Sequence, residues 1–208
     1  MNKINNSKFK NKAFLACILI LGACATGPTL APTGTFGSGQ KVVLDRNWSD
    51  VTGMWRVVDG RILPSNKKVK TLTIDGSDLN SLYISQGLGS EDPLMIGPNG
   101  NSRSNPSPRP SNNMSLSEQI EYVGRSMTEA GYLHVETKTP RPVNLSGQRG
   151  VRFELNMRNS AGLNISGLAQ AVNKGGLNYY IVYIAPSEYY YQSHLENVIK
   201  TMDSATLP

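Results

Sequence analysis

The chain has 208 residues and a formal net charge of +6, with 21 lysines and arginines against 15 aspartates and glutamates. Lys3, Lys8, Lys10 and Lys12 precede Cys24 and no acidic residue does, so the remainder carries 6 − 4 = +2, which gives no support to nucleic-acid binding. Both cysteines lie within the first 24 residues, which excludes a disulfide in the remaining chain and leaves its stability to a hydrophobic core.

Residues 1–23 have the layout of a secretory signal peptide. The four lysines are followed by residues 13–23, a run of 11 that are all apolar or small. A helix needs about 20 apolar residues to cross a bilayer, so this run is a poor transmembrane anchor. We therefore expect the segment to be removed after export.

The segment ends in a sequence that resembles the lipobox of bacterial lipoproteins, namely Leu21, Gly22, Ala23 and Cys24. The resemblance implies that the Cys24 thiol receives a diacylglycerol, that cleavage precedes Cys24, and that the new amine is acylated, for example with palmitate. Several acyl chains hold a protein stably on a membrane. Ala25 then points to the outer membrane, with the domain facing the periplasm. An ordinary cleaved signal, an uncleaved helix and lipidation at Cys17 are the alternatives.

The next segment, 24–40, is predicted to be a flexible tether behind the lipidated cysteine. From Ala25 to Gln40 it is rich in Gly, Thr, Pro and Ala, has Phe36 as its single aromatic residue, and carries no charge. A coil of this length would span roughly 20 to 25 Å. We expect one globular domain to follow, at 41–208.

The first part of that domain is predicted to contain short strands. Apolar and β-branched residues recur between turns rich in Asp, Gly, Ser and Asn. Two tryptophans, Trp48 and Trp55, follow the first of these strands and are expected to pack in the core. The predicted strands are 42–44, 71–74 and 82–84.

Residues 93–113 are predicted to form a disordered loop. The segment has five prolines and many Asn, Ser and Gly residues, and its only charges are Arg103 and Arg109. Such a composition buries too little apolar surface to offset the entropy cost of ordering. A short docking motif built on the alternating prolines 106, 108 and 110 is the alternative.

The strongest local signals lie between residues 115 and 185. Ser115 and Glu118 form a capping-box signature at the start of an amphipathic helix that ends near Gly131. Residues 132–139 are expected to be extended, and 151–158 alternate apolar with polar side chains, as in a strand with one buried face. The segments 163–172 and 177–185 flank a Gly-Gly turn and predict a hairpin whose second strand is central.

Pro186 is expected to stop that strand, and Ser187 to cap a final helix. This order of elements predicts an α+β fold in which helices cover an antiparallel sheet as an α/β/α sandwich. The strand, the Ala185-Pro186-Ser187 turn and the aromatic helix start resemble the PsbP-like fold of exported proteins. The resemblance implies an accessory or assembly module without a catalytic centre.

Common catalytic signatures are missing from the sequence: it has no G-x-S-x-G, Walker loop, C-x-x-C or H-E-x-x-H motif. His134 and His194 are its two histidines, and each is expected at a surface or a helix edge. His134 and Glu136 could share one face of a strand, but two ligands make a weak metal site. We therefore expect no enzymatic activity, no metal and no cofactor.

Six of the nine tyrosines fall between Tyr179 and Tyr191. Packing of helix against sheet accounts for most of them, while Tyr189 and Tyr190 are the possible partner surface. The leading hypothesis is a membrane-anchored envelope lipoprotein that binds another envelope protein through its sheet edge or its tyrosine-rich end. A carrier of a small apolar ligand, or a hydrolase with an unrecognised site at His134, remain the alternatives.

Overall fold

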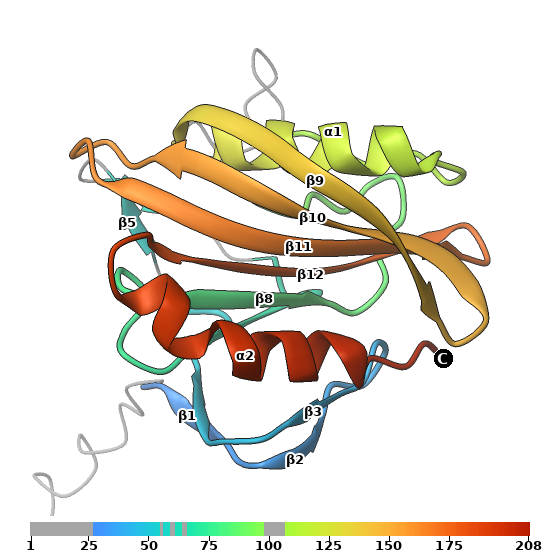
Figure 1. Ribbon diagram of the computed structural model, residues 1–208, viewed down its shortest axis with the longest axis horizontal. Helices are drawn as coiled ribbons and strands as arrows, with labels where there is room; N and C mark the ends of the chain where they lie inside the picture. Colours follow the sequence, from blue (N-terminus) through green and yellow to red (C-terminus); the bar gives the residue numbers. More distant parts are fainter. Residues whose placement is uncertain (1–26, 55, 59–60, 64–65, 98–106) are drawn as a thin grey trace, which may run out of the picture.

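Two helices and twelve strands make up the described part of the chain (Figure 1). A computed structural model describes residues 27–54, 56–58, 61–63, 66–97 and 107–208. The lipobox, Trp55 and the middle of the 93–113 segment lie outside these residues, so what was expected of them stays a prediction. The elements are, in chain order, β1 (Thr29–Ala31), β2 (Gly34–Phe36), β3 (Val42–Leu44), β4 (Trp48–Asp50), β5 (Arg56–Val58), β6 (Arg61–Leu63), β7 (Val69–Thr73), β8 (Ser81–Ser85), α1 (Leu116–Glu129), β9 (Leu133–Leu145), β10 (Gln148–Arg158), β11 (Asn164–Lys174), β12 (Leu177–Pro186) and α2 (Tyr190–Asp203).

Eight of the strands form one sheet in the order β1-β4-β7-β8-β12-β11-β10-β9, and every neighbouring pair is antiparallel. β12 lies between β8 and β11, and its residues from Asn178 to Pro186 are all buried. The predicted central position of this strand is therefore confirmed. Outside the sheet, β2 pairs with β3 and β5 pairs with β6.

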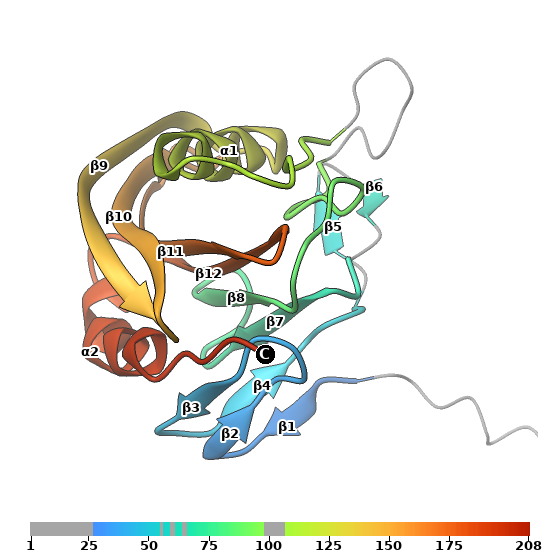
Figure 2. The ribbon, with the colours of Figure 1, turned by 90° about the vertical axis from the view of Figure 1, so that its right-hand side faces the viewer.

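The two helices lie on opposite sides of the sheet (Figure 2). α1 packs mainly against β9, β10 and β11, and α2 mainly against β12, β11 and β3. Two hydrophobic clusters result, one on each face: α1 contributes Tyr122, Val123 and Met127 to the first, and α2 contributes Tyr191, Val198 and Met202 to the second. No helix among the described residues is long and apolar enough to cross a membrane.

The prediction of an α+β sandwich, in which helices cover the sheet, is wrong. The eight-stranded sheet dominates the described chain, and each of the two helices has its main contacts with only two or three strands of that sheet. Val42 and Leu44 of β3 help to close the cluster beside α2, and Leu94 and Met95 help to close the one beside α1. Several strands have three residues, too few for an alternating pattern to reveal them.

The structure also changes the extent of the tether. The segment 24–40 was expected to be flexible throughout, yet it contains β1 and β2. β1 pairs with β4, and its last residue, Ala31, is 1% exposed within the hydrophobic cluster beside α2. Among the described residues, the fold therefore already includes Thr29, ahead of the expected start at Lys41. Backbone pairing of a short edge strand needs little apolar sequence, so composition alone could not reveal it.

Most elements with a strong local signal are where the sequence places them. The capping box is present at the start of α1: the Glu118 backbone N–H donates to Ser115 Oγ at 3.3 Å, and the Ser115 N–H donates to Glu118 Oε2 at 2.7 Å. β10 has the predicted buried and exposed faces. β11 and β12 form the predicted hairpin, and Gly175 and Gly176 have φ angles of 61° and 77°, which favour glycine.

The described flanks of the 93–113 segment are packed rather than loose. Leu94 and Met95 are buried, and the Leu94 N–H donates to the Tyr122 hydroxyl at 2.8 Å. On the other side, the Asn178 side chain donates to the carbonyl of Ser111 at 2.9 Å. The prediction of disorder therefore does not hold for these flanks, because buried amide and hydroxyl groups supply partners for their backbone.

Candidate functional site

The last strand leads directly into a group of tyrosines at the start of α2. β12 ends at Pro186, and α2 begins at Tyr190, preceded by Tyr189 as an N-cap without a side-chain capping bond. The predicted cap, Ser187, instead places its Oγ 2.8 Å from Ser166 Oγ on β11. This hydroxyl pair fastens the turn to the sheet, so the helix starts later than expected.

Tyr189 and Tyr190 form an aromatic pair with one exposed member. Tyr189 is 68% exposed, whereas Tyr190 is partly buried against the hydrophobic cluster. Their rings meet edge to face, with centroids 5.2 Å apart and planes at 87°. Ser193 Oγ donates to the Tyr189 carbonyl at 2.8 Å, and the Tyr183 hydroxyl donates to the Tyr190 carbonyl at 2.9 Å. The exposed ring is therefore carried by a backbone that is hydrogen-bonded on both residues.

Two further tyrosines, Tyr183 and Tyr191, lie next to this pair and stack on each other. The rings of Tyr183 and Tyr191 stack with centroids 5.7 Å apart and planes at 19°. Burial raises the pKa of Tyr183, and burial together with the nearby Glu154 raises the pKa of Tyr191 to about 12. Both hydroxyls therefore stay protonated near neutral pH and can act as hydrogen-bond donors.

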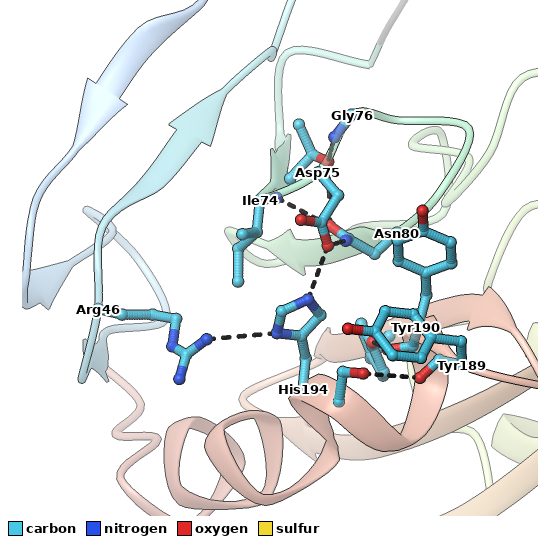
Figure 3. A network of polar contacts seen from close by, with 11 residues as sticks. Arg46, Ile74, Asp75, Gly76, Asn80, Tyr189, Tyr190 and His194 are labelled. Atoms are coloured by element: carbon cyan, nitrogen blue, oxygen red, sulfur yellow. Dashed lines mark hydrogen bonds and ion pairs between the residues drawn. The ribbon is translucent and has the colours of Figure 1, made fainter.

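His194, one turn further along α2, is clamped between two loops (Figure 3). It is 8% exposed, so of the two expected places, a surface or a helix edge, the surface does not hold. Its Nε2 lies 2.7 Å from Asp75 Oδ2, and its Nδ1 lies 3.4 Å from Arg46 Nη1. A neutral ring with its proton on Nε2 satisfies both contacts, since it donates to the carboxylate and accepts from the guanidinium.

Asp75 is itself held by the turn between β7 and β8. The side chain of Asn80, which is 1% exposed, donates to Asp75 Oδ2 at 2.5 Å and accepts from the Ile74 N–H at 2.8 Å through Oδ1. Gly76 has a φ of 111°, and its N–H donates to Thr73 Oγ1 at 3.0 Å. The carboxylate that meets His194 therefore belongs to a turn with its own hydrogen-bond network.

Arg46 connects the same helix to the turn between β3 and β4. The Asn197 side chain of α2 lies between Arg46 and Asp45. In the amide orientation that satisfies both neighbours, its oxygen accepts from Arg46 Nε at 2.8 Å and its nitrogen donates to Asp45 Oδ2 at 2.8 Å. Two loops thus bind α2 at His194 and Asn197. Because both nitrogens of the His194 ring already have partners, the ring has no free nitrogen for general-base chemistry on an outside molecule.

The second histidine lies in a different place, beside an open hollow of about 420 Å³ on β9 and β10. Its lining is mostly polar, which does not suit the apolar ligand considered above. His134 sits at an irregularity in the pairing of β9 with β10 and has a φ of 52°, a conformation that is uncommon for residues other than glycine. The residues that line the hollow are His134, Glu136, Lys138, Asn156, Met157, Arg158 and Asn164.

The proposed cooperation of His134 with Glu136 finds little support in this geometry. Both residues line the hollow, but the Glu136 carboxylate lies 2.9 Å from Lys138 Nζ. The hydrogen bond and the charge of Lys138 lower the pKa of Glu136, and His134 contributes less. The described residues contain no group of three or more His, Cys, Asp or Glu side chains that could hold a metal.

Sequence reasoning did not identify Asp75, Asn80 or Arg46 as partners of the α2 start. Asp75 lies 119 residues and Arg46 lies 148 residues from His194 in the sequence. No local pattern links positions so far apart. The one available signal was the Asp-Gly turn at 75–76, which predicts a turn but says nothing about what that turn contacts.

The sequence matches no protein-family model and no curated protein. Among solved structures, the chain is similar to cyanobacterial PsbP (CyanoP) from Synechocystis sp. PCC 6803, with a TM-score of 0.50, 12% sequence identity, and coverage of 90% of this chain and 99% of that one. The chain has a PsbP-like fold. A second neighbour is the Saccharomyces cerevisiae Ran-binding protein Mog1p, with a TM-score of 0.49, 10% identity, and coverage of 87% and 95%. The predicted PsbP-like resemblance is confirmed at the level of fold.

Proposed function

We propose that the chain is an envelope lipoprotein, held on the outer membrane by lipid on Cys24, that binds another envelope protein without catalysing a reaction. The observation that carries the binding role is the exposure of Tyr189, which keeps 68% of its surface exposed next to a hydrophobic cluster. Tyrosine is enriched at the centres of protein interfaces, where one ring supplies both apolar area and a polar tip.

The way in which Tyr189 is held strengthens this proposal. Its ring rests edge-on against Tyr190, and both backbone carbonyls accept hydrogen bonds from neighbouring hydroxyls. Ordering a flexible side chain on binding costs about 0.5–1.5 kcal/mol, so a ring that is already positioned binds with a smaller entropy loss. The clamp around His194 fixes the helix that carries the ring.

The fold itself does not choose the partner. One fold commonly serves many functions, so the likeness to CyanoP supports only the architecture. The absence of catalysis in the proposal rests on the occupied His194 ring and on the pairing of Glu136 with Lys138. The membrane location rests on the resemblance of residues 21–24 to a lipobox.

Crosslinked purification of the tagged protein from its own membranes tests the proposal. The wild type is compared with Cys24→Ala, which removes the anchor, and with Tyr189→Ala, which removes the exposed ring. We expect a discrete envelope protein to copurify with the wild type and to be depleted in both variants. Recovery of the same proteins with wild type and Tyr189→Ala would contradict the assigned surface.

A further inference from the structure

The structure sets an upper limit on the distance between Cys24, the proposed site of lipid attachment, and the first strand, β1. β1 begins at Thr29, five residues after Cys24, and Leu30 is the next residue. A fully extended chain spans at most about 3.6 Å per residue, so Thr29 lies within about 18 Å of Cys24, and Leu30 within about 22 Å, whatever path the chain takes. A lipid on Cys24 therefore keeps the β1 edge of the sheet close to the bilayer.

Two exposed apolar side chains lie at this edge, and the exposed residues Lys41, Asp45 and Arg46 flank β3 there. Leu30 is 68% exposed on β1, and Val43 is 49% exposed on β3. Their neighbours Ala31, Val42 and Leu44 point into the core, so these two side chains face outward by strand alternation. Residues 25–40 contain no charged side chain, so contact of β1 and β2 with lipid desolvates no ion within them, while the charges that flank β3 fit the polar headgroup level.

The arrangement of the strands gathers these residues at one end of the molecule. β1, β2 and β3 lie together, and α1 lies at the opposite end in both views (Figures 1 and 2). Within the sheet, β1 is an edge strand. Of the strands that α1 contacts, β11 is the nearest to β1, and it is five strand spacings, or about 24 Å, away. The short chain from Cys24 therefore favours one orientation of the domain over the others.

We propose that the end formed by β1–β3 rests on the lipid surface, with Leu30 and Val43 at the headgroup level and α1 directed away from the bilayer. This inference rests on the proposed lipid attachment at Cys24. The occupant of the exposed apolar surface is then the membrane that holds the chain. A mature domain close to the bilayer replaces the loosely tethered one that composition suggested.

Single-cysteine labelling tests the orientation. Cys24 is the only cysteine from position 24 onward, and lipid would occupy its thiol, so Leu30→Cys and Val43→Cys each introduce one free thiol. The matched control is Arg125→Cys on α1, where the side chain is 60% exposed. Each lipidated variant is purified from membranes, labelled with an environment-sensitive fluorophore, and reconstituted into vesicles of phosphatidylethanolamine and phosphatidylglycerol containing a quencher-labelled lipid.

We expect blue-shifted emission and strong quenching by the labelled lipid at positions 30 and 43, and neither at position 125. Water-like emission at positions 30 and 43, in protein that floats with the vesicles, overturns the inference and leaves the lipoprotein proposal intact. A blue shift without lipid quenching overturns it in favour of contact between copies of the chain. Protein that fails to float overturns the anchoring on which both proposals rest.

Discussion

Asp75→Ala probes the clamp around His194, because it removes an acceptor that two buried donors share. His194 Nε2 and Asn80 Nδ2 both contact Asp75 Oδ2, and these residues are 8% and 1% exposed. A buried donor without an acceptor costs about 1–3 kcal/mol. Since 33% of the Asp75 side chain is exposed, water can enter the vacated space and offset part of the loss. We expect the free energy of unfolding to fall by about 2 kcal/mol.

Urea unfolding followed by circular dichroism measures this change, and the thermal midpoint should fall by about 4–8 °C for a domain of this size. Asp78→Ala is the matched control, since it lies in the same turn, is exposed, and makes no ion pair or side-chain hydrogen bond within the described chain. We expect the control to change stability by less than about 0.5 kcal/mol. Equal unfolding midpoints for the two variants would refute the reasoning, as would an unchanged His194 ring signal in NMR spectra of Asp75→Ala.

Three further outcomes follow from other parts of the molecule. Tyr189→Ala should weaken partner binding by about 2 kcal/mol, or roughly 30-fold, as for an interface hot spot, with an unchanged melting temperature; equal affinity in a binding titration would contradict this. Ser115→Ala should destabilise α1 by about 1 kcal/mol, because it removes the Oγ acceptor of the Glu118 N–H, while the pKa of Glu118 stays below its ordinary value since the backbone N–H of residue 115 still donates to its carboxylate; an unchanged free energy of unfolding would argue against the capping box. Burial raises the pKa of Tyr191 from 10.0 to about 12, so its contribution to stability is complete below pH 10 and is lost as pH rises through 12. The tyrosinate absorbance of Tyr191 should therefore appear together with unfolding, and ionisation of Tyr191 without loss of structure would contradict this.

The elements that the sequence predicted well are those specified by neighbouring residues. The capping box at Ser115 and Glu118 satisfies backbone groups within one turn, so its signature needs no tertiary information. β10 alternates between buried and more exposed residues over 151–158, and the β11–β12 hairpin is joined at the Gly175-Gly176 turn. In each case the physical cause and the sequence signal occupy the same short segment.

The remaining features depend on partners that are distant in the sequence. β1 has three residues and becomes a strand through pairing with β4, so its composition resembled that of a tether. The predicted covering of the sheet by helices was also wrong because of distant contacts. Short strands and the Leu94–Met95 segment, rather than further helices, close the hydrophobic core. At the candidate site, Tyr189 was found as part of a tyrosine-rich segment, whereas the burial of His194 depends on Asp75 and Arg46 from two separate turns.

Photo-crosslinking in living cells tests the central claim, that the surface at Tyr189 binds another envelope protein. A photoreactive phenylalanine analogue is introduced at position 189 and, as control, at Leu163, which is 41% exposed in the turn between β10 and β11. The account predicts a discrete light-dependent adduct with an envelope protein from position 189, absent from position 163 and lost when Cys24→Ala is added. No adduct from position 189, or the same adducts from both positions, would contradict it.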